Sequence, residues 1–350
     1  MGMLRGSRPK TFDGGVSIAL FISSFANRKY EISNTGNGSG VRLRARRSLL
    51  AILVLIAHGL VLPATFARAA ENAPAAPAEA ASAPTPMPAP SEWTFAQYNA
   101  LAEATGRKMT MSQGTFDSVQ QRKGPAIARI EKYLAGHFGQ ADARVLDAFR
   151  ALPREYFHYN YEGKYSTAAS AYEAEPKPWG IGYGSALSDY LGQAYMTQLS
   201  NPQSTDVVLE IGTGSGFQSS LLSRLTKEVY TIEIIKPLGE AVAEAIKTGG
   251  YDNVHQKVGD GYYGWPEVDG GFDIIMVTCA ALYVPPALLE QLRPGTGRLI
   301  IPVGPAIRGK QILYVYTKDA DGKVHSKRDV GVYFIPMTGA MQEKPKPGAK

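Results

Sequence analysis

Short apolar runs alternate with amphipathic segments from about residue 123 onward. These short segments predict strands at 206–211, 229–234, 254–258, 272–278 and 298–303. The amphipathic segments predict helices at 125–134, 141–152, 189–199, 217–225 and 237–248. Two further apolar runs, 311–317 and 328–334, flank the turn sequence at 319–323 and predict an antiparallel hairpin. The pattern therefore indicates an α/β fold whose mostly parallel sheet ends in an antiparallel C-terminal hairpin.

The first ninety residues have a different composition from the rest. Four arginines lie within 42–47, and they are followed by the apolar stretch 48–62 and then by Ala67-Arg68-Ala69. A basic segment, a short apolar segment and a small-residue site in this order are typical of a cleaved export signal. We expect a signal peptide at 41–69, cleaved after Ala69, and an extended linker at 70–92, which is rich in Ala and Pro.

Residues 1–40 precede this signal, although signal peptides begin close to the N-terminus. No methionine lies between Met3 and Met87, whereas a valine codon at Val41 can serve as a bacterial start. Our hypothesis is that 1–40 is an untranslated or disordered extension. We expect residues 93–343 to form one folded domain and 344–350 to form a tail. We expect export, to the periplasm, with no stable membrane span in the mature chain; a cytoplasmic location is the alternative.

The charge distribution changes the picture of possible partners. The whole chain carries a net charge of +6, but the first 69 residues carry ten bases and two acids. The remaining part is therefore slightly acidic, and such a domain has no electrostatic attraction for a phosphate backbone. We expect no nucleic-acid partner. We also expect no metal site, because the chain has one cysteine and its five histidines are far apart.

A glycine-rich sequence, Gly212-Thr213-Gly214-Ser215-Gly216, follows the first strand of the series and precedes a helix. Such a turn lets a ligand approach the backbone and the amides of the helix. Glu233 ends the next strand, where an acid can accept both hydroxyls of a ribose. Asp260 follows the third strand, where an acid can accept an adenine amino group. These positions predict a nucleoside-containing cofactor.

Two cofactors fit a glycine turn of this kind. The usual NAD fingerprint has two residues between its second and third glycines, and this chain has one. Glu210 also precedes the first glycine, where it would lie near a pyrophosphate, whereas it suits a cationic cofactor. We therefore expect S-adenosyl-L-methionine. The expected cofactor-binding residues are Glu210, Gly212, Thr213, Gly214, Gly216, Glu233, Asp260 and Gly261.

The chain resembles the protein-L-isoaspartate (D-aspartate) O-methyltransferase family from about Gly136 to Gly339. The motifs that carry the resemblance lie at 143–150, 153–157, 208–218, 259–261, 264–267, 284–292, 301–304 and 334–339. The resemblance implies a Rossmann-like fold that uses S-adenosyl-L-methionine. It also implies methyl esterification of abnormal aspartyl carboxylates, with proteins or peptides containing isoaspartyl residues as partners. We expect a monomer.

The resemblance further implies which residues hold the acceptor. The family has a serine in a segment of the form Gly-Gln-Thr-Ile-Ser-Gln-Pro, and here 184–190 retains that serine as Ser188. Four other positions differ, with Ser185, Ala186, Asp189 and Tyr190 in place of Gln, Thr, Gln and Pro. We expect Ser188 to be catalytic and Ser185 and Thr278 to contact substrate. The alternative role for Ser188 is that of a helix N-cap, and the charge of Asp189 is expected to repel a carboxylate substrate.

Three functions remain open at this point. The first is an exported methyltransferase for protein repair, and the second is a methyltransferase for another carboxylate substrate. The third is a non-catalytic cofactor-binding or scaffold protein with the same fold. Two facts count against the exported repair enzyme. The 185–190 segment is altered, and the periplasm is not expected to hold S-adenosyl-L-methionine. The aromatic stretch 156–172 is expected to be a packed surface loop or a lid over the substrate cleft.

Overall fold

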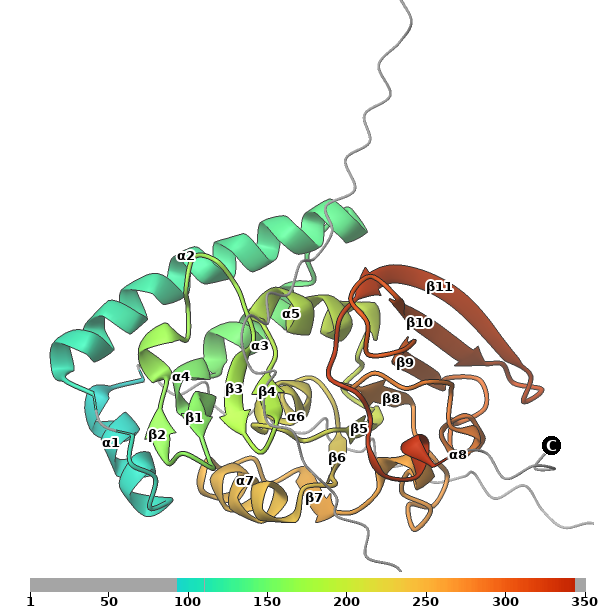
Figure 1. Ribbon diagram of the computed structural model, residues 1–350. Coiled ribbons are helices and arrows are strands. Elements are labelled where there is room, and N and C mark those ends of the chain that lie inside the picture. The colour runs from blue at the N-terminus through green and yellow to red at the C-terminus, as the bar shows by residue number, and fades with distance from the viewer. Residues whose placement is uncertain (1–92, 110, 344–350) are drawn as a thin grey trace, which may run out of the picture. The chain divides into compact units, whose positions relative to one another are not determined.

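A seven-stranded sheet lies at the centre of the computed structural model, which describes residues 93–109 and 111–343 (Figure 1). Its strands run in the order β11-β10-β9-β8-β5-β6-β7. The strands are β5 (Val207–Ile211), β6 (Glu228–Glu233), β7 (Val254–Val258), β8 (Ile274–Val277), β9 (Arg298–Val303), β10 (Gln311–Lys318) and β11 (Val324–Val332). Strands β5 to β9 pair in parallel, whereas β9–β10 and β10–β11 are antiparallel. The predicted Rossmann-like fold is confirmed.

Eight α-helices surround the sheet within the described residues. They are α1 (Phe95–Ala104), α2 (Gln113–Phe138), α3 (Ala143–Ala151), α4 (Arg154–Phe157), α5 (Tyr190–Leu199), α6 (Phe217–Ser223), α7 (Lys236–Thr248) and α8 (Pro286–Glu290). Short elements complete the fold: β1 (Tyr159–Asn160), β2 (Tyr165–Ser166), β3 (Trp179–Gly182), β4 (Ser185–Leu187), η1 (Ala168–Ser170), η2 (Gly261–Tyr263) and η3 (Gly339–Gln342). The expected segments at 1–40, 41–69, 70–92 and 344–350 lie outside the described residues.

The central strands β5 and β8 are buried because both faces of the sheet are covered there. Val208 packs with Met196 of α5 and Leu222 of α6 in one apolar cluster. Leu209, the next residue along β5, packs with Leu288 of α8 in a second cluster on the opposite face. Burial on both faces explains why β5 reads as a continuous apolar run rather than as an alternating one.

The structure corrects two local predictions. Helix α2 begins at Gln113, well before the predicted 125, and Pro125 lies inside it. Strand β11 begins at Val324 rather than at 328, because Lys318 pairs with Val324 and extends the hairpin to the turn. The first half of β11 is charged and exposed, as an edge strand can be, and therefore lacks an apolar signal.

The two ends of the aromatic stretch 156–172 are buried. Tyr156, Phe157 and Tyr172 are at most 4% exposed, and they pack in one cluster with residues of α1 and α2. Arg107, which follows α1, lies 4.1 Å from the centre of the Tyr156 ring and donates a hydrogen bond of 2.8 Å to the Tyr156 carbonyl oxygen. Only the middle of the stretch lies at the surface, where Tyr165 is 52% exposed.

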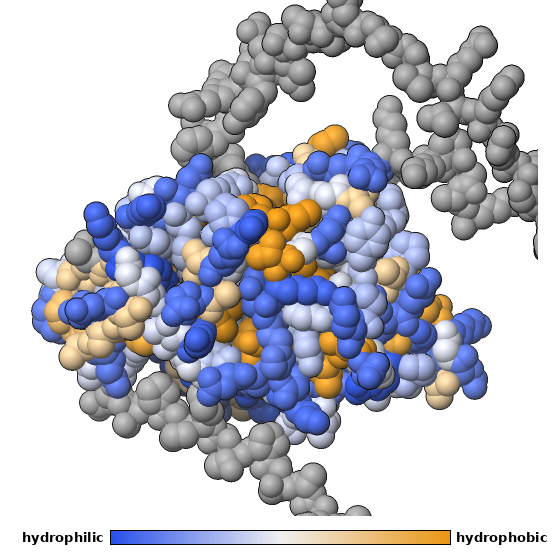
Figure 2. Space-filling view, turned by 90° about the horizontal axis from the view of Figure 1, so that it is seen from below, coloured by the Kyte–Doolittle hydropathy of each residue, from blue (hydrophilic) through white to orange (hydrophobic). Residues whose placement is uncertain are grey.

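Apolar side chains reach the surface at several places. On the face that Figure 2 shows, hydrophobic residues form patches separated by hydrophilic ones. The large apolar side chains that are most exposed include Tyr263 at 57% and Leu282 at 55%. Among the described helices, none combines the length and the apolar character that crossing a membrane requires.

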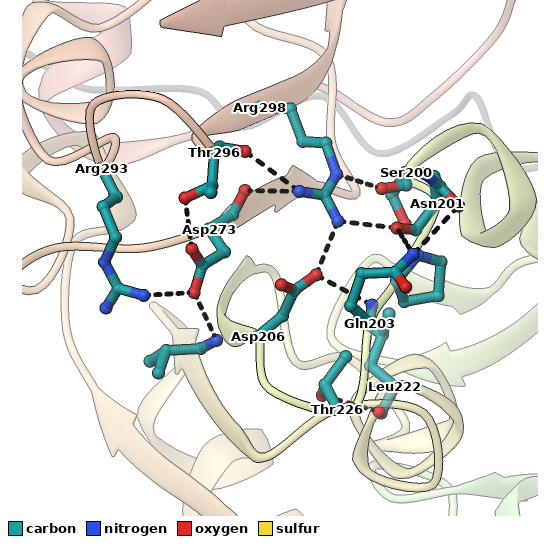
Figure 3. Close-up of polar contacts among 12 residues, drawn as sticks. Ser200, Asn201, Gln203, Asp206, Leu222, Thr226, Asp273, Arg293, Thr296 and Arg298 are labelled. Atoms are coloured by element: carbon teal, nitrogen blue, oxygen red, sulfur yellow. Dashed lines mark hydrogen bonds and ion pairs between the residues drawn. The ribbon is translucent and has the colours of Figure 1, made fainter. Parts of the chain in front are cut away.

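A buried ionic network joins the amino ends of β5, β8 and β9 (Figure 3). Arg298, the first residue of β9, donates a hydrogen bond of 2.6 Å to Asp206 Oδ2 and others to the carbonyl oxygens of Ser200 and Asn201. Asp273, which precedes β8, accepts from the Val207 amide at 2.9 Å and from Arg293 at 2.5 Å. The network holds three strands together at the end of the sheet opposite the carboxyl ends.

We predict that Arg298→Met lowers the free energy of unfolding by about 3–5 kcal/mol, because it leaves Asp206 buried without its cation. Urea denaturation monitored by circular dichroism measures this change. The matched control is Arg150→Met, which removes an ion pair with Asp147 whose side chains are 51% and 70% exposed. Its expected cost is below about 1 kcal/mol. Equal losses in the two variants would contradict a stabilising role of the buried network.

Candidate functional site

A cavity of about 410 Å³ opens at the carboxyl ends of β5, β6 and β8. Strand β5 lies between β6 and β8 in the sheet. The chain therefore builds the sheet outward in one direction through β6 and in the opposite direction through β8. Open α/β sheets bind their ligands at such a switch point. The opposite wall of the cavity comes from the β3–β4 hairpin, from the first turns of α5 and from residues 330–338.

The glycine-rich turn after β5 is held tightly against β8. Gly212 has φ +102°, and a Cβ atom at this position would lie 2.6 Å from Thr278 Oγ1. The Thr278 hydroxyl is 2.9 Å from the carbonyl oxygen of Ile211 and 2.8 Å from that of Gly212, and its one proton is directed at these acceptors. Thr278, expected to contact substrate, therefore lines the cavity as a clamp on the turn.

Glu233 fixes the same turn from the other side. Its Oε2 accepts a hydrogen bond of 2.9 Å from the Gly214 amide, and its Oε1 accepts one of 3.0 Å from the Ile235 amide. The side chain lines the cavity although the residue is only 4% exposed. Each carboxylate oxygen has a further lone pair, so Glu233 can accept hydroxyl groups from a ligand without releasing the turn.

Glu210 is fully buried in the cavity wall, with one oxygen satisfied. Oε2 accepts from the Thr231 hydroxyl at 2.7 Å, and Thr231 in turn accepts from the Thr213 hydroxyl at 2.8 Å. Oε1 has no hydrogen-bond partner among the described residues. Burial raises the pKa of Glu210 to about 8. A cationic ligand beside Oε1 would supply the missing donor and favour the ionised form.

Asp260 links the cavity to the C-terminal segment. Its Oδ1 accepts from the Tyr262 amide at 2.9 Å, and its Oδ2 accepts from the Ala340 amide at 2.7 Å. The segment before Ala340 is also held by Ala280, which exchanges backbone hydrogen bonds with Ile335 and Met337. Asp260 and Gly261 both line the cavity, and so do residues 332–338.

Gly216, the third glycine of the turn, packs against α7. Gly216 is absent from the described cavity lining, whereas Thr213 and Gly214 belong to it. A Cβ atom at Gly216 would lie 3.0 Å from side-chain carbons of both Val242 and Ile246 in α7. Gly216 therefore allows the turn to pack closely on α7, and its contact with a cofactor stays a prediction.

Ser185 and Ser188 lie on the acceptor side of the cavity. Within the described part of the chain, no hydrogen-bond partner is found for either hydroxyl group. The N-cap of α5 is Asp189, whose Oδ1 accepts from the amides of Leu191 at 3.0 Å and Gly192 at 2.9 Å. The alternative role of Ser188 as N-cap is therefore wrong, and its hydroxyl remains available to a ligand.

Several cavity residues lie outside the motifs that the sequence pattern singles out. They are Gln193, Tyr195 and Met196 of α5 and Val330, Val332 and Tyr333, which precede the 334–339 motif. They are distant from the glycine turn in sequence, and their types are common in ordinary cores. Only the packing of α5 and the C-terminal segment on the sheet brings them to the site.

Comparison with known proteins agrees with this geometry. The model of the family described as protein-L-isoaspartate(D-aspartate) O-methyltransferase matches residues 131–342. Protein-L-isoaspartate O-methyltransferase 1 of Nitrosospira multiformis is 48% identical over 169 residues, which are 48% of this chain and 70% of the relative. The corresponding protein of Opitutus terrae is 45% identical over 204 residues, which are 58% of this chain and 82% of the relative.

A solved structure shows the same relationship. A protein-L-isoaspartate O-methyltransferase superposes with a TM-score of 0.54 and 26% identity, covering 63% of this chain and 67% of that one. The matched family region includes the sheet, the glycine-rich turn and both walls of the cavity. The chain therefore belongs to the protein-L-isoaspartate (D-aspartate) O-methyltransferase family.

Proposed function

We propose that this protein is an S-adenosyl-L-methionine-dependent carboxyl O-methyltransferase that esterifies isoaspartyl residues of damaged proteins and peptides. The observation that carries the proposal is the pairing of two walls in one cavity. Buried acids at the ends of β5 and β6 form one wall, and the two unbonded hydroxyls of Ser185 and Ser188 form the other. Family membership and the names of the relatives support the same activity.

The residues of the first wall fit the cofactor. Glu210 holds an unpartnered carboxylate oxygen just behind the cavity surface, where its charge favours a cation, and Glu233 offers lone pairs to a ribose diol. Asp260 holds the C-terminal segment over the same end of the cavity, and the Gly212 turn leaves room for a ligand at the backbone. When bound there, S-adenosyl-L-methionine supplies an electrophilic methyl group.

The residues of the second wall need only to position the acceptor. An ionised carboxylate is itself a nucleophile, so the protein has no proton to remove from it. Ser188 and Ser185 can donate hydrogen bonds to one carboxylate oxygen and leave the other free to react. Holding the reactants in line accounts for the rate enhancement expected of such a site.

The contacts of Asp189 support an acceptor site beside it in spite of its charge. Its carboxylate caps α5, and the guanidinium of Arg154 lies close enough to offset its charge. Arg154 also donates a hydrogen bond of 2.6 Å to the Ser188 carbonyl oxygen. The acceptor segment is thus anchored by a cation behind it, which reduces the repulsion expected from the sequence.

We further propose export by residues 42–69, with a mature chain that begins at Ala70. The support is the order of basic, apolar and small residues in that segment. The substrates are then exported proteins, and the active form is a monomer.

The activity is tested with Ser188→Ala, assayed for methyl transfer to an isoaspartyl peptide. We expect kcat to fall about ten- to a hundredfold, because one positioning hydrogen bond is lost. Cofactor affinity should not change, and neither should stability, since Asp189 provides the helix cap. Ser118→Ala, an exposed serine of α2, is the control and should keep full activity. A wild-type protein that binds cofactor but does not methylate the peptide contradicts the function.

A second prediction concerns the pH dependence of cofactor binding. With a pKa of about 8, Glu210 is mostly protonated at pH 7 in the free protein, and a cationic ligand requires its carboxylate. Binding should therefore release nearly one proton at pH 7, and the dissociation constant should fall about tenfold per unit from pH 6 to 7.5. Calorimetry in two buffers of different ionisation enthalpy measures the proton. Glu210→Gln should bind more weakly and lose both effects; a wild-type protein with no proton release refutes the linkage.

Export is tested by fusing residues 41–69 to a reporter enzyme that is active only in the periplasm. We expect an active reporter whose processed N-terminus follows Ala69. The matched control, Leu53→Arg, places a charge in the apolar stretch and should abolish export. An inactive wild-type fusion retained in the cytosol would support the cytoplasmic alternative.

A further inference from the structure

Gln193, in the first turns of α5, is a polar residue of the cavity wall to which no role has been given above. The residue is 6% exposed and lines the cavity together with Ser185 and Ser188. Its Oε1 accepts a hydrogen bond of 2.5 Å from Arg154 Nη1. A buried amide that is bonded at one end and lies at a ligand cavity with the other is well placed to recognise a ligand by hydrogen bonding.

Arg154 fixes the direction of this amide. A guanidinium group has only hydrogen-bond donors, so the side chain of Gln193 must present its oxygen to Arg154. The amide is planar, and its NH₂ group therefore points away from the arginine. Among residues 93–109 and 111–343 no acceptor is found for Gln193 Nε2, and this atom is not among the fully enclosed ones that lack a partner. Its donors are thus open to the cavity.

The same guanidinium also positions Ser188. Arg154 Nη2 donates to the Ser188 carbonyl oxygen at 2.6 Å, while Nη1 binds Gln193. The group is held from behind by the ring of Phe217, whose centre lies 4.8 Å from its central carbon. Burial lowers the pKa of Arg154 to about 10, so the side chain remains a cation at neutral pH. One rigid cation therefore sets the relative position of two donors on the cavity wall.

We propose that Gln193 Nε2 is a substrate-binding donor for the acceptor carboxylate, acting beside the Ser188 hydroxyl, and that Arg154 is the positioning residue for both. This inference rests on the proposed carboxyl methyltransferase activity and names the residue that recognises its acceptor. An amide NH₂ and a hydroxyl are both donors, which is the combination that an ionised carboxylate requires. The nearby cation of Arg154 offsets the charge of Asp189, the anion in this part of the wall.

Two variants at this position separate hydrogen bonding from shape. Gln193→Met keeps the volume and removes both donors and the acceptor. Gln193→Glu keeps the shape and the acceptor for Arg154, but it replaces the open NH₂ by an anionic oxygen. The control is Gln198→Met on the same helix, whose amide bonds to Gln140 and Asp142, outside the cavity lining.

The experiment measures kcat and KM for an isoaspartyl peptide, together with the dissociation constant of S-adenosyl-L-methionine by calorimetry. We expect KM to rise about ten- to a hundredfold in Gln193→Met, the effect of losing a hydrogen bond to a charged group. In Gln193→Glu it should rise at least as much, because the new charge faces the carboxylate. Cofactor affinity should stay within twofold in both, and Gln198→Met should keep the wild-type KM.

The outcomes distinguish this inference from the function on which it rests. An unchanged KM in Gln193→Glu, with an active wild-type protein, would overturn the role of Gln193 and leave the methyltransferase activity in place. Equal losses of peptide and cofactor binding would also overturn it, since they would assign Gln193 to the cofactor side. A wild-type protein that binds cofactor but transfers no methyl group to the peptide would reject both.

Discussion

The carboxylate of Glu233 is the contact on which the geometry of the site depends. It binds the Gly214 amide with one oxygen and the Ile235 amide with the other, and thereby joins the glycine-rich turn to the end of β6. Thr278 binds the same turn from β8. The turn is therefore held by both neighbours of β5, and the backbone beside the cavity cannot relax. A preorganised turn of this kind is what a cofactor with a fixed shape requires.

Buried charge is placed unequally on the two sides of the cavity. On the cofactor side, Glu210 is fully buried without a cation, and its pKa rises to about 8 for that reason. On the acceptor side, Asp189 faces a compensating cation in Arg154. The first arrangement favours a positively charged ligand, and the second lets an anionic ligand approach a wall that contains a carboxylate. The two halves of a reaction between a sulfonium group and a carboxylate thus find opposite electrostatic surroundings.

The class of fold follows from local pattern alone. Parallel strands buried on both faces must be continuous apolar runs, and the predicted strand at 298–303 coincides with β9, whose four central residues are buried. The pattern fails to predict a strand where the strand is exposed and has no apolar run. The start of β11 is an exposed edge with charged residues, and Lys318 pairs with Val324 through backbone hydrogen bonds that need no apolar side chain. Helix α2 likewise continues on both sides of Pro125, although the sequence pattern before this proline did not predict a helix.

For the site, the sequence by itself determined the strand-end positions of Glu210, Glu233 and Asp260, because a parallel sheet brings the carboxyl ends of its strands to one edge. The tertiary structure decided what each side chain binds. The Ser188 hydroxyl has no helix-capping role because Asp189 caps the helix. The Gln193 amide is oriented because Arg154, which is far from it in sequence, can only donate hydrogen bonds. Such roles depend on contacts between residues far apart in the chain, and neither periodicity nor the spacing of a motif records them.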